Sequence, residues 1–353
     1  MSLNLVEIFK DTREKSNDIY KSVTEQLLRD TKVYKYPSLL NIEGKKKSTF
    51  QHLSLIDNDT ITTAYRFINT YQKVAVLNFA DAIQPGGLVF EGAKTQEENI
   101  CRRTNLYESL LNSDEYYRIN KEVEQSDILE GIYSDTIIYS KGVLVIKDSN
   151  YNDCVPKKID VITCPSPSIY DKCTDINQVY RNRIRGIVKS AVFNDIECIV
   201  LGAWGCGAFH QDPKDISKAF LDVLSEYKYF KEVAFAIPKG NNYRVFMSTF
   251  MNKGLYMDRS SLLKEGTVVE HFKRETLVDE EIDSMMFRYQ IIGISLDTTT
   301  NEDVVVYKAL YTNEDGKYLM FTRPVDEFLS KVDKVKYPNI EREYRFQECK
   351  IIT

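Results

Sequence analysis

The sequence predicts an α/β protein in which helices cover a mainly parallel β-sheet, followed by a small all-β domain. Through the first two thirds of the chain, short runs of apolar β-formers alternate with segments of helical periodicity, which is the order of a parallel sheet. The last third has strand after strand and no long helix. A chain of 353 residues is also too long for one ordinary hydrophobic core, so we expect two domains.

The elements of the first domain are predicted from local patterns. Residues 3–29 carry apolar side chains at helical spacing among many charges, which indicates one or two amphipathic helices packed on the domain that follows. Asp212 and Pro213 are typical of a helix start, because they supply a capping side chain and then proline at the first helical position. The predicted strands are residues 74–79, 136–139, 143–146, 161–164, 198–201 and 233–237, and the predicted longer helices are 177–193 and 213–226.

The pattern changes after about residue 257. Residues 268–272, 288–296, 304–311 and 318–321 alternate or cluster β-formers, with polar turns between them. This arrangement is typical of a small barrel or sandwich. The predicted divisions are a first domain at 1–257, of which 1–70 are mostly a helical extension, a charged linker at 258–266, a small β-barrel at 267–335 and a C-terminal tail at 336–353.

Composition excludes some classes of function. The formal net charge of −5 argues against a broad, non-specific grip on nucleic acid, although a local basic groove is compatible with it. No apolar run approaches the roughly 18 residues that a membrane span needs, and the start MSLNLVEIFKDTREK does not resemble a signal peptide. The seven cysteines form no CxxC pair and are typical of reduced thiols, so we expect a cytoplasmic protein. They are Cys101, Cys154, Cys164, Cys173, Cys198, Cys206 and Cys349.

The most informative segment, residues 74–110, joins an apolar strand, a glycine turn and an acidic helix start. The strand contains few polar residues, as expected for one buried on both faces. Gly86 and Gly87 follow it, and glycines at this place leave backbone N–H groups uncovered, so that a diphosphate can lie against them. Taken alone, the pair is also consistent with an ordinary turn.

The helix after this turn opens with Gln96, Glu97 and Glu98. Neighbouring helical residues point about 100° apart, so the two glutamates are not expected to act as a facing pair of glycosidase carboxylates. We expect separate roles for them. Thr95 and Glu98 also fit a capping box, in which Glu98 only returns a hydrogen bond to the helix start.

A second glycine turn follows the strand at 198–201. Loops after parallel strands lie on one edge of a sheet, so this turn and the first one are expected to face a common crevice. Its candidate ligand-binding residues are Gly205, Cys206, Gly207, Ala208 and Phe209. Trp204 is expected in the core rather than at the ligand. Cys206 and His210 form a CxxxH pair, which lacks the further ligands or the base that a metal site or a thiol catalyst needs.

Four segments resemble one family in order and context: NFADAIQPGG, QEENICRRTNLY, VITCPSPS and LGAWGCGAFHQDP. They are similar to the microbial branch of the poly(ADP-ribose) glycohydrolases, a macrodomain family, over about residues 1–255. The resemblance implies a macrodomain-like three-layer α/β/α fold with a mainly parallel, mixed sheet. The C-terminal segments VVEHFKR, YQIIGIS, VVVYKALY and FTRPVDEFLSKV resemble a small uncharacterised bacterial domain, which is expected to form an SH3-like barrel.

The resemblance also implies roles for residues. Glu98 matches the catalytic glutamate of the family, Glu97 would hold ribose hydroxyls, and Gln96 would orient the site. Leu88 stands where the family has a third glycine, and its side chain would either crowd the ribose or diphosphate or line the pocket if its φ is negative. The implied substrate contacts are Asn78 and Phe209 for ribose, and Gly86, Gly87, Gly205, Cys206, Gly207 and Ala208 for the diphosphate.

Two classes of function follow. The first is an enzyme that hydrolyses ADP-ribosyl linkages without a metal or cofactor, most simply the ribose–ribose bonds of poly(ADP-ribose), or else mono-ADP-ribose on protein or nucleic acid. One carboxyl group that protonates the leaving oxygen and then activates water serves both halves of such a reaction. The second is a reader that binds ADP-ribose without turnover. Glu97 and Glu98 favour the enzyme, and Leu88 favours the reader or a changed substrate. No membrane partner is expected.

Overall fold

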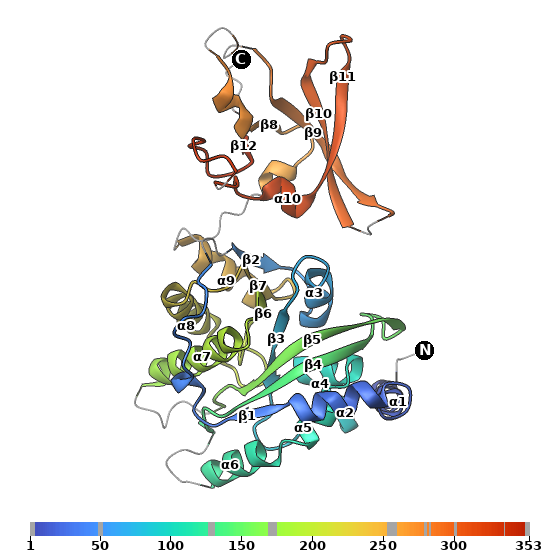
Figure 1. The fold of residues 1–353 in the computed structure, drawn as a ribbon, viewed down its shortest axis with the longest axis vertical. Helices are drawn as coiled ribbons and strands as arrows, with labels where there is room; N and C mark the ends of the chain where they lie inside the picture. The colour runs from blue at the N-terminus through green and yellow to red at the C-terminus, as the bar shows by residue number, and fades with distance from the viewer. Residues whose placement is uncertain are drawn as a thin grey trace. The chain divides into compact units, whose positions relative to one another are not determined.

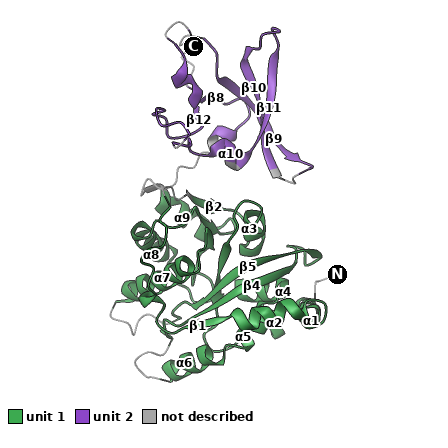
Figure 2. Ribbon diagram, in the orientation of Figure 1, with its two compact units in different colours: residues 1–256 green, residues 257–353 purple. Residues whose placement is uncertain are grey.

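The chain forms two compact units, Met1–Tyr256 and Met257–Thr353 (Figure 2). The structure is a computed structural model. It describes residues 4–48, 52–125, 131–168, 175–252, 260–278, 281, 284–299, 302–334 and 336–349.

One sheet runs through unit 1, and in the described residues it has seven strands. They are β1 (Lys32–Tyr34), β2 (His52–Ile56), β3 (Val74–Ala80), β4 (Ile137–Lys147), β5 (Asp153–Pro165), β6 (Cys198–Leu201) and β7 (Glu232–Ala236), in the order β1-β4-β5-β3-β6-β7-β2. From β5 to β2 all neighbours are parallel, whereas β4 is antiparallel to both β1 and β5. The predicted sheet, mainly parallel and mixed, is therefore confirmed.

Helices cover both faces of this sheet (Figure 1). One core cluster joins the odd-numbered side chains of β3, such as Leu77, to α7 (Ile176–Phe193), α8 (Pro213–Glu226) and α9 (Asn241–Asn252). The other joins the even-numbered side chains, such as Val76, to the remaining helices. These are α1 (Leu5–Asn17), α2 (Lys21–Asp30), α3 (Thr60–Phe67), α4 (Gln96–Arg103), α5 (Leu106–Leu111) and α6 (Asp114–Glu124), with short 3₁₀ turns η1 (Pro37–Leu39) and η2 (Val89–Glu91). The three-layer α/β/α arrangement predicted from the sequence is thus confirmed.

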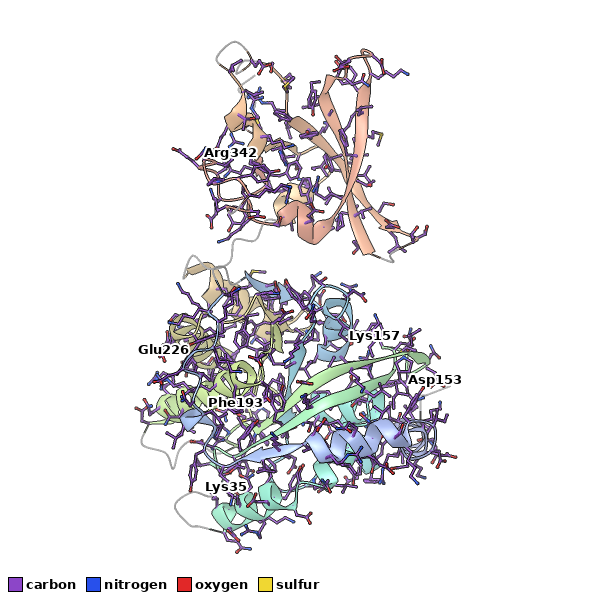
Figure 3. All side chains as sticks on the ribbon, viewed as in Figure 1. Lys35, Asp153, Lys157, Phe193, Glu226 and Arg342 are labelled. Atoms are coloured by element: carbon purple, nitrogen blue, oxygen red, sulfur yellow. The ribbon has the colours of Figure 1, made fainter. Side chains whose placement is uncertain are left out.

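The N-terminal segment is more than a helical extension. Besides α1, α2 and α3 it supplies β1 and β2, which pair with β4 and β7 at the two edges of the sheet. Ion pairs tie α1 to the β4–β5 pair: Lys15 Nζ lies 2.7 Å from Asp153 on β5, and Lys147 Nζ on β4 lies 2.5 Å from Asp11. Figure 3 shows Asp153 on β5, close to α1. The segment therefore belongs to the body of the domain.

Strand β4 corrects one prediction. Residues 136–139 and 143–146 were expected as two strands, but they form one strand with an irregular register between Ser140 and Val143. Gly142 has a positive φ of +80° there, and its N–H donates to Asp160 at 2.9 Å. In a sequence, such a glycine indicates the end of a strand. Here its positive φ accommodates a bulge within one continuous strand.

Unit 2 is an antiparallel sheet in the order β11-β10-β9-β8-β12. Its elements are η3 (Ser260–Leu263), β8 (Val268–His271), η4 (Phe272–Thr276), β9 (Arg288–Asp297), β10 (Glu302–Thr312), β11 (Tyr318–Pro324), α10 (Val325–Leu329) and β12 (Phe346–Glu348). Glu270 is paired with Arg274, Arg288 and Arg342. Burial raises the pKa of its carboxyl, but hydrogen bonds from Arg288 and Arg342 outweigh this effect and lower the pKa to about 2. A separate β unit is therefore confirmed, and its likeness to an SH3 barrel stays a prediction.

The limits of unit 2 differ from those expected. Leu262, inside the predicted linker 258–266, is buried in the core of unit 2. Residues 336–353 were expected as a tail, but β12 pairs with β8 and Phe346 is buried in the same core. The strand of three residues was too short for its pattern to be recognised.

The cysteines that the structure describes are free thiols, and Cys173 lies outside the described residues. Within those residues no helix is both long and apolar enough to cross a membrane.

Candidate active site

The carboxyl ends of β3, β5 and β6 bring the sequence motifs together. β3 lies between β5 and β6 and is parallel to both, so that the chain leaves all three strands at one edge. A Cβ added to Gly205, after β6, would collide with Ser166, after β5. A Cβ on Gly202 would lie 2.9 Å from the Phe79 ring of β3. The two glycine turns therefore share one edge, as the sequence predicts.

Glu97 lies at the start of α4, and only 2% of its surface is exposed. Its Oε1 accepts a hydrogen bond from Asn78 Nδ2 at 3.0 Å, and its Oε2 accepts one from the Asp81 N–H at 2.7 Å. Burial raises the pKa of this carboxyl well above its usual range, against the two hydrogen bonds, which favour the charged form. The charges of Asp81 and Glu98 act in the same direction as burial. Glu97 is thus fixed to the end of β3.

Glu98 is also buried, at 4% exposure, but its partners come from the loop between β3 and α4. Its Oε1 accepts the Leu88 N–H at 3.0 Å, and its Oε2 accepts the Thr95 hydroxyl. Thr95 makes no side-chain cap on the helix. The reciprocal bonds of a capping box are not made, because Glu98 accepts the Thr95 hydroxyl instead of the Thr95 N–H and also binds the glycine turn through the Leu88 N–H.

Gly87 leaves the space in which the carboxylates of Glu97 and Glu98 both lie against the first glycine turn. A Cβ on this residue would lie 2.6 Å from Glu98 Oε1 and 3.3 Å from Glu97 Oε2, and its φ of +54° already favours glycine. Gly86 has φ +69°, and a Cβ there would lie 2.8 Å from the Tyr107 ring. Both glycines therefore make room for side chains packed beneath the turn.

The N–H groups of this turn are mostly used within the protein. The Gly87 N–H donates to Gln84 O at 3.1 Å, and the Val89 N–H donates to Gly86 O at 3.3 Å. With the Leu88 N–H bound to Glu98, only the Gly86 N–H lacks an acceptor among the described residues of this turn. The turn therefore positions Glu98, a catalytic candidate, and leaves few of its own N–H groups available to bind a diphosphate.

Leu88, the departure from the family pattern, has an unstrained backbone with φ −92°. Its side chain is 44% exposed. The negative φ fits the expectation that the Leu88 side chain lines the pocket and does not crowd the substrate. The residue needs no glycine-like conformation.

Gln96 is occupied by the strand that precedes the turn. Its Oε1 accepts the Phe79 N–H at 2.8 Å, and its Nε2 donates to Leu77 O at 2.7 Å and to Thr60 Oγ1 at 3.1 Å. Both ends of the amide therefore join α4 to β3 and to α3. This supports a role in orienting the site and leaves little of the side chain for a substrate.

Asn78 is fully buried beside Glu97. Its Nδ2 also approaches Thr163 Oγ1 on β5 at 3.3 Å, whereas its Oδ1 has no hydrogen-bond partner in the described structure. A buried acceptor of this kind is costly unless a ligand or water supplies a donor. Asn78 is therefore suited to receive a hydroxyl group.

The second glycine turn presents free backbone donors. Among the residues described, the N–H groups of Gly207, Ala208 and Phe209 make no hydrogen bond. Gly207 and Ala208 are exposed and Phe209 is half-buried. Successive unpaired amides in a turn form an anion-binding concavity. This turn therefore supports the predicted diphosphate contact better than the first one does.

Trp204 and Cys206 have structural surroundings. Trp204 is fully buried and donates from Nε1 to Cys164 O at 3.1 Å, which confirms its predicted place in the core. Burial raises the pKa of the Cys206 thiol to about 12, so that the thiolate a nucleophile would need is disfavoured. No three His, Cys, Asp or Glu side chains gather as a possible metal site across the described part of the chain.

Arg102 and Arg103 follow the glutamates on α4, and each of them tethers other segments. Arg102 donates to the carbonyls of Leu5 and Ala93, and Arg103 lies 2.7 Å from Asp59. Both are buried, so their contact with a phosphate is not supported. Both arginines therefore act as tethers within the core.

Sequence reasoning missed the pair Tyr116 and Tyr117 on α6. Both are buried, and neither hydroxyl has a partner in the described structure. The nearby charges of Glu97 and Asp81 act on both rings. No local pattern in the sequence distinguishes these two tyrosines from other buried side chains.

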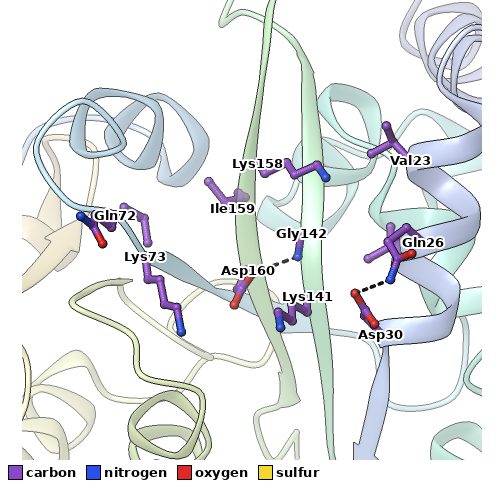
Figure 4. Close-up of a pocket in the computed structure, with 12 residues that line it drawn as sticks. Val23, Gln26, Asp30, Gln72, Lys73, Lys141, Gly142, Lys158, Ile159 and Asp160 are labelled. Atoms are coloured by element: carbon purple, nitrogen blue, oxygen red, sulfur yellow. Dashed lines mark hydrogen bonds between the residues drawn. The ribbon is translucent and has the colours of Figure 1, made fainter. Parts of the chain in front are cut away.

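A cavity of about 240 Å³ lies at the opposite end of β3, next to Val74 (Figure 4). Lys73, Lys141 and Lys158 line it together with acidic side chains. Figure 4 shows the lysine side chains directed to different places and Asp160 bonded to Gly142. This cavity is separate from the edge at which the motifs meet.

The chain is similar to proteins of known structure. Residues 6–148 match the model of the family described as the catalytic domain of microbial-type PARG. These residues are similar to the catalytic domain of microbial-type PARG. Poly(ADP-ribose) glycohydrolase (PARG) from Thermomonospora curvata, bound to the inhibitor ADP-HPD, is 27% identical with a TM-score of 0.62, over 70% of this chain and 99% of that one. The resemblance predicted from the sequence is therefore confirmed.

A second PARG structure, from Deinococcus radiodurans in complex with ADP-ribose, is 25% identical with a TM-score of 0.59. The match covers 65% of this chain and 98% of that one. Residues 267–348 match a family described as a protein of unknown function, DUF1653. No curated protein matches the chain. The PARG-like part thus accounts for unit 1, and unit 2 is an additional domain.

Proposed function

We propose that unit 1 hydrolyses ADP-ribosyl glycosidic bonds, and in the first place the ribose–ribose bonds of poly(ADP-ribose). The observation that carries this proposal is the pair of buried carboxylates at Gly87, one fixed to β3 and the other bound to the glycine turn. The PARG match and the bound ligands of the two similar structures support it.

Glu98 is the proposed general acid and base. In the first step its proton goes to the leaving ribose oxygen, and the bond from that oxygen to the anomeric carbon breaks with both electrons on the oxygen. In the second step the Glu98 carboxylate takes a proton from water, and the water oxygen forms the new bond to the anomeric carbon. The products are ADP-ribose and a shortened chain, and Glu98 regains its proton.

The other contacts position the substrate. Glu97 and the free Oδ1 of Asn78 are proposed to accept hydrogen bonds from ribose hydroxyls. The unpaired amides at Gly207, Ala208 and Phe209 are proposed to hold the diphosphate. Phe209, half-buried next to these amides, is proposed to lie against the distal ribose.

The experiment uses the full chain, and its matched variants are Glu98→Gln and Glu91→Gln. Glu91 is an exposed glutamate in the same loop and serves as the control. The proteins are incubated with poly(ADP-ribose), mono-ADP-ribosylated protein and mono-ADP-ribosylated DNA, and free ADP-ribose is measured. We expect release from poly(ADP-ribose), with the rate lowered about 10²–10⁴-fold by Glu98→Gln and unchanged by Glu91→Gln.

The other results change the proposal in defined ways. Binding of ADP-ribose without release from any substrate would identify a reader. Release only from a mono-ADP-ribosylated substrate would keep the chemistry and replace the substrate. Equal rates for the wild type and Glu98→Gln would remove Glu98 from its role.

A further inference from the structure

Gln211 closes the second glycine turn with its backbone. Its N–H donates to Gly205 O at 3.0 Å, so that the chain between the two residues forms a closed loop. The N–H groups of Gly207, Ala208 and Phe209, which make no hydrogen bond among the residues described, lie within this loop. The turn is therefore closed at Gln211, while the amides proposed to bind the diphosphate stay free.

The side chain of Gln211 is 3% exposed, and its amide is bound at both ends. Its Oε1 accepts the hydroxyl of Tyr180 on α7. Its Nε2 donates to Pro167 O, in the segment that follows β5, at 2.5 Å. One side chain thus joins the second glycine turn to α7 and to the segment after β5.

Gly205 brings the turn directly against this side chain. A Cβ on Gly205 would lie 2.8 Å from Gln211 Cγ and would collide with Ser166. With φ +76°, Gly205 also has a backbone conformation that favours glycine. No space separates the turn from the Gln211 side chain, so a displacement of that side chain is passed on to the turn.

The surroundings of Gln211 are themselves fixed in the core. Tyr180 is 3% exposed and packs edge-on against Trp204, with the ring centroids 6.5 Å apart. Arg183, buried about one helical turn further along α7, donates from Nη1 to Pro165 O at 3.1 Å. Helix α7 therefore holds the segment after β5 directly, as well as through Gln211.

A row of unpaired amides depends on outside contacts for its conformation, because it lacks the internal hydrogen bonds that stabilise regular structure. Donors that are oriented in advance bind an anion without a cost of reorganisation. We propose that Gln211 is a positioning residue for the diphosphate of ADP-ribose, and that it fixes the free amides of the second glycine turn in their binding orientation. This inference deepens the proposed function and rests on its diphosphate contact.

The first test is the affinity of the full chain for ADP-ribose. Gln211→Met keeps the length of the side chain and removes both of its hydrogen bonds, and Tyr180→Phe removes one of them. Asn105→Leu is the matched control, since Asn105 is a buried amide of unit 1 that joins α2 to β4 through Thr24 and Leu144. We expect the dissociation constant to rise about 10–100-fold with Gln211→Met, as for one lost hydrogen bond to a charged group, to rise less with Tyr180→Phe, and to stay unchanged with Asn105→Leu.

Amide hydrogen exchange of the ligand-free chain separates positioning from a general loss of stability. Gln211→Met should speed the exchange of the hydrogen-bonded N–H groups of Trp204, Cys206 and Gln211 and leave the exchange of β3 and β4 as in the wild type. A uniform increase throughout unit 1 would show a merely structural role and overturn the inference. If Gln211→Met does not fold, Tyr180→Phe provides the same readout.

The remaining outcomes are also decisive. Equal dissociation constants for the wild type and Gln211→Met, or unchanged exchange in the turn, would overturn the inference. Neither readout requires turnover. A wild type that binds ADP-ribose without hydrolysing any substrate would disprove the proposed enzyme and leave the inference intact, whereas a wild type that binds no ADP-ribose would refute both.

Discussion

Gly87 permits the sharpest test of the candidate site, because the structure separates two costs of giving it a side chain. Its φ of +54° makes an alanine strained, by about 1 kcal/mol. In addition, the alanine Cβ would lie 2.6 Å from Glu98 Oε1, far inside the 3.4 Å of an ordinary contact. Gly44 has a similar φ of +78° with nothing within 4 Å, so Gly44→Ala measures the backbone cost alone.

The additional cost at Gly87 comes from Glu98. To accept the Cβ, the carboxylate must retreat by about an ångström and lose the 3.0 Å hydrogen bond from the Leu88 N–H. A lost hydrogen bond to a buried polar group costs about 1–3 kcal/mol. We therefore expect Gly87→Ala to lower the free energy of unfolding of unit 1 by about 2–4 kcal/mol, against about 1 kcal/mol for Gly44→Ala.

The assay is urea unfolding followed by tryptophan fluorescence. Trp204 is the single tryptophan of the chain and is buried in unit 1, so its emission reports that unit. A displacement of about 1 Å at a catalytic group also costs about 10²-fold in rate, so ADP-ribose release should fall with Gly87→Ala and persist with Gly44→Ala. Equal destabilisation by the two substitutions, with the rate retained, would refute the reasoning.

Three further predictions concern the same edge of the sheet. Leu88→Gly should lower the stability by up to about 1 kcal/mol through backbone entropy and leave ADP-ribose release unchanged, because Leu88 has a negative φ; a large gain in rate would show that its side chain crowds the substrate. Burial raises the folded-state pKa of Glu97 above the unfolded value of about 4.3. The protonated carboxyl therefore contributes its full stabilisation below a pH of about 4.3, and this contribution is lost as the pH rises through the folded-state pKa. Urea titrations at several pH values should therefore show a fall in stability with rising pH that disappears in Glu97→Gln. Gly205→Ala should destabilise unit 1, because φ is +76° and the Cβ would collide with Ser166, whereas Gly207→Ala has open space and should leave the urea midpoint unchanged.

The strands in the middle of the sheet could be predicted almost to the residue. Residues 198–201 were expected as a strand and form β6, and the expected strand 74–79 forms β3 with one more residue. Such strands are buried on both faces, so their sequence is a nearly continuous apolar run. The edge strands β1 and β2 contain lysine, histidine or serine, and their conformation depends on pairing with β4 and β7 rather than on their own pattern.

The site was predictable in its composition but not in its contacts. The motifs identified Glu97, Glu98 and the glycine turn, and parallel topology predicted their common edge. The hydrogen-bond partner of each side chain depends on residues that are distant in the sequence, such as Thr163 beside Asn78. Local pattern could therefore not tell that the Leu88 N–H serves Glu98, or that Gln96 is used to hold β3.

The two glutamates differ because of what each is attached to. Glu97 is held by Asn78 on β3 and by the Asp81 N–H directly after it, so its position follows the rigid centre of the sheet. Glu98 is held by Leu88, in the middle of the loop between β3 and α4, and by Thr95, at the end of that loop, so its position follows the shape of the loop. Binding of ribose needs a hydrogen-bond acceptor in a fixed position. Proton transfer, first to the leaving oxygen and then from water, needs a carboxyl group that the turn facing the substrate positions. The different attachments thus supply a physical reason for the unequal roles that we propose for these two adjacent residues.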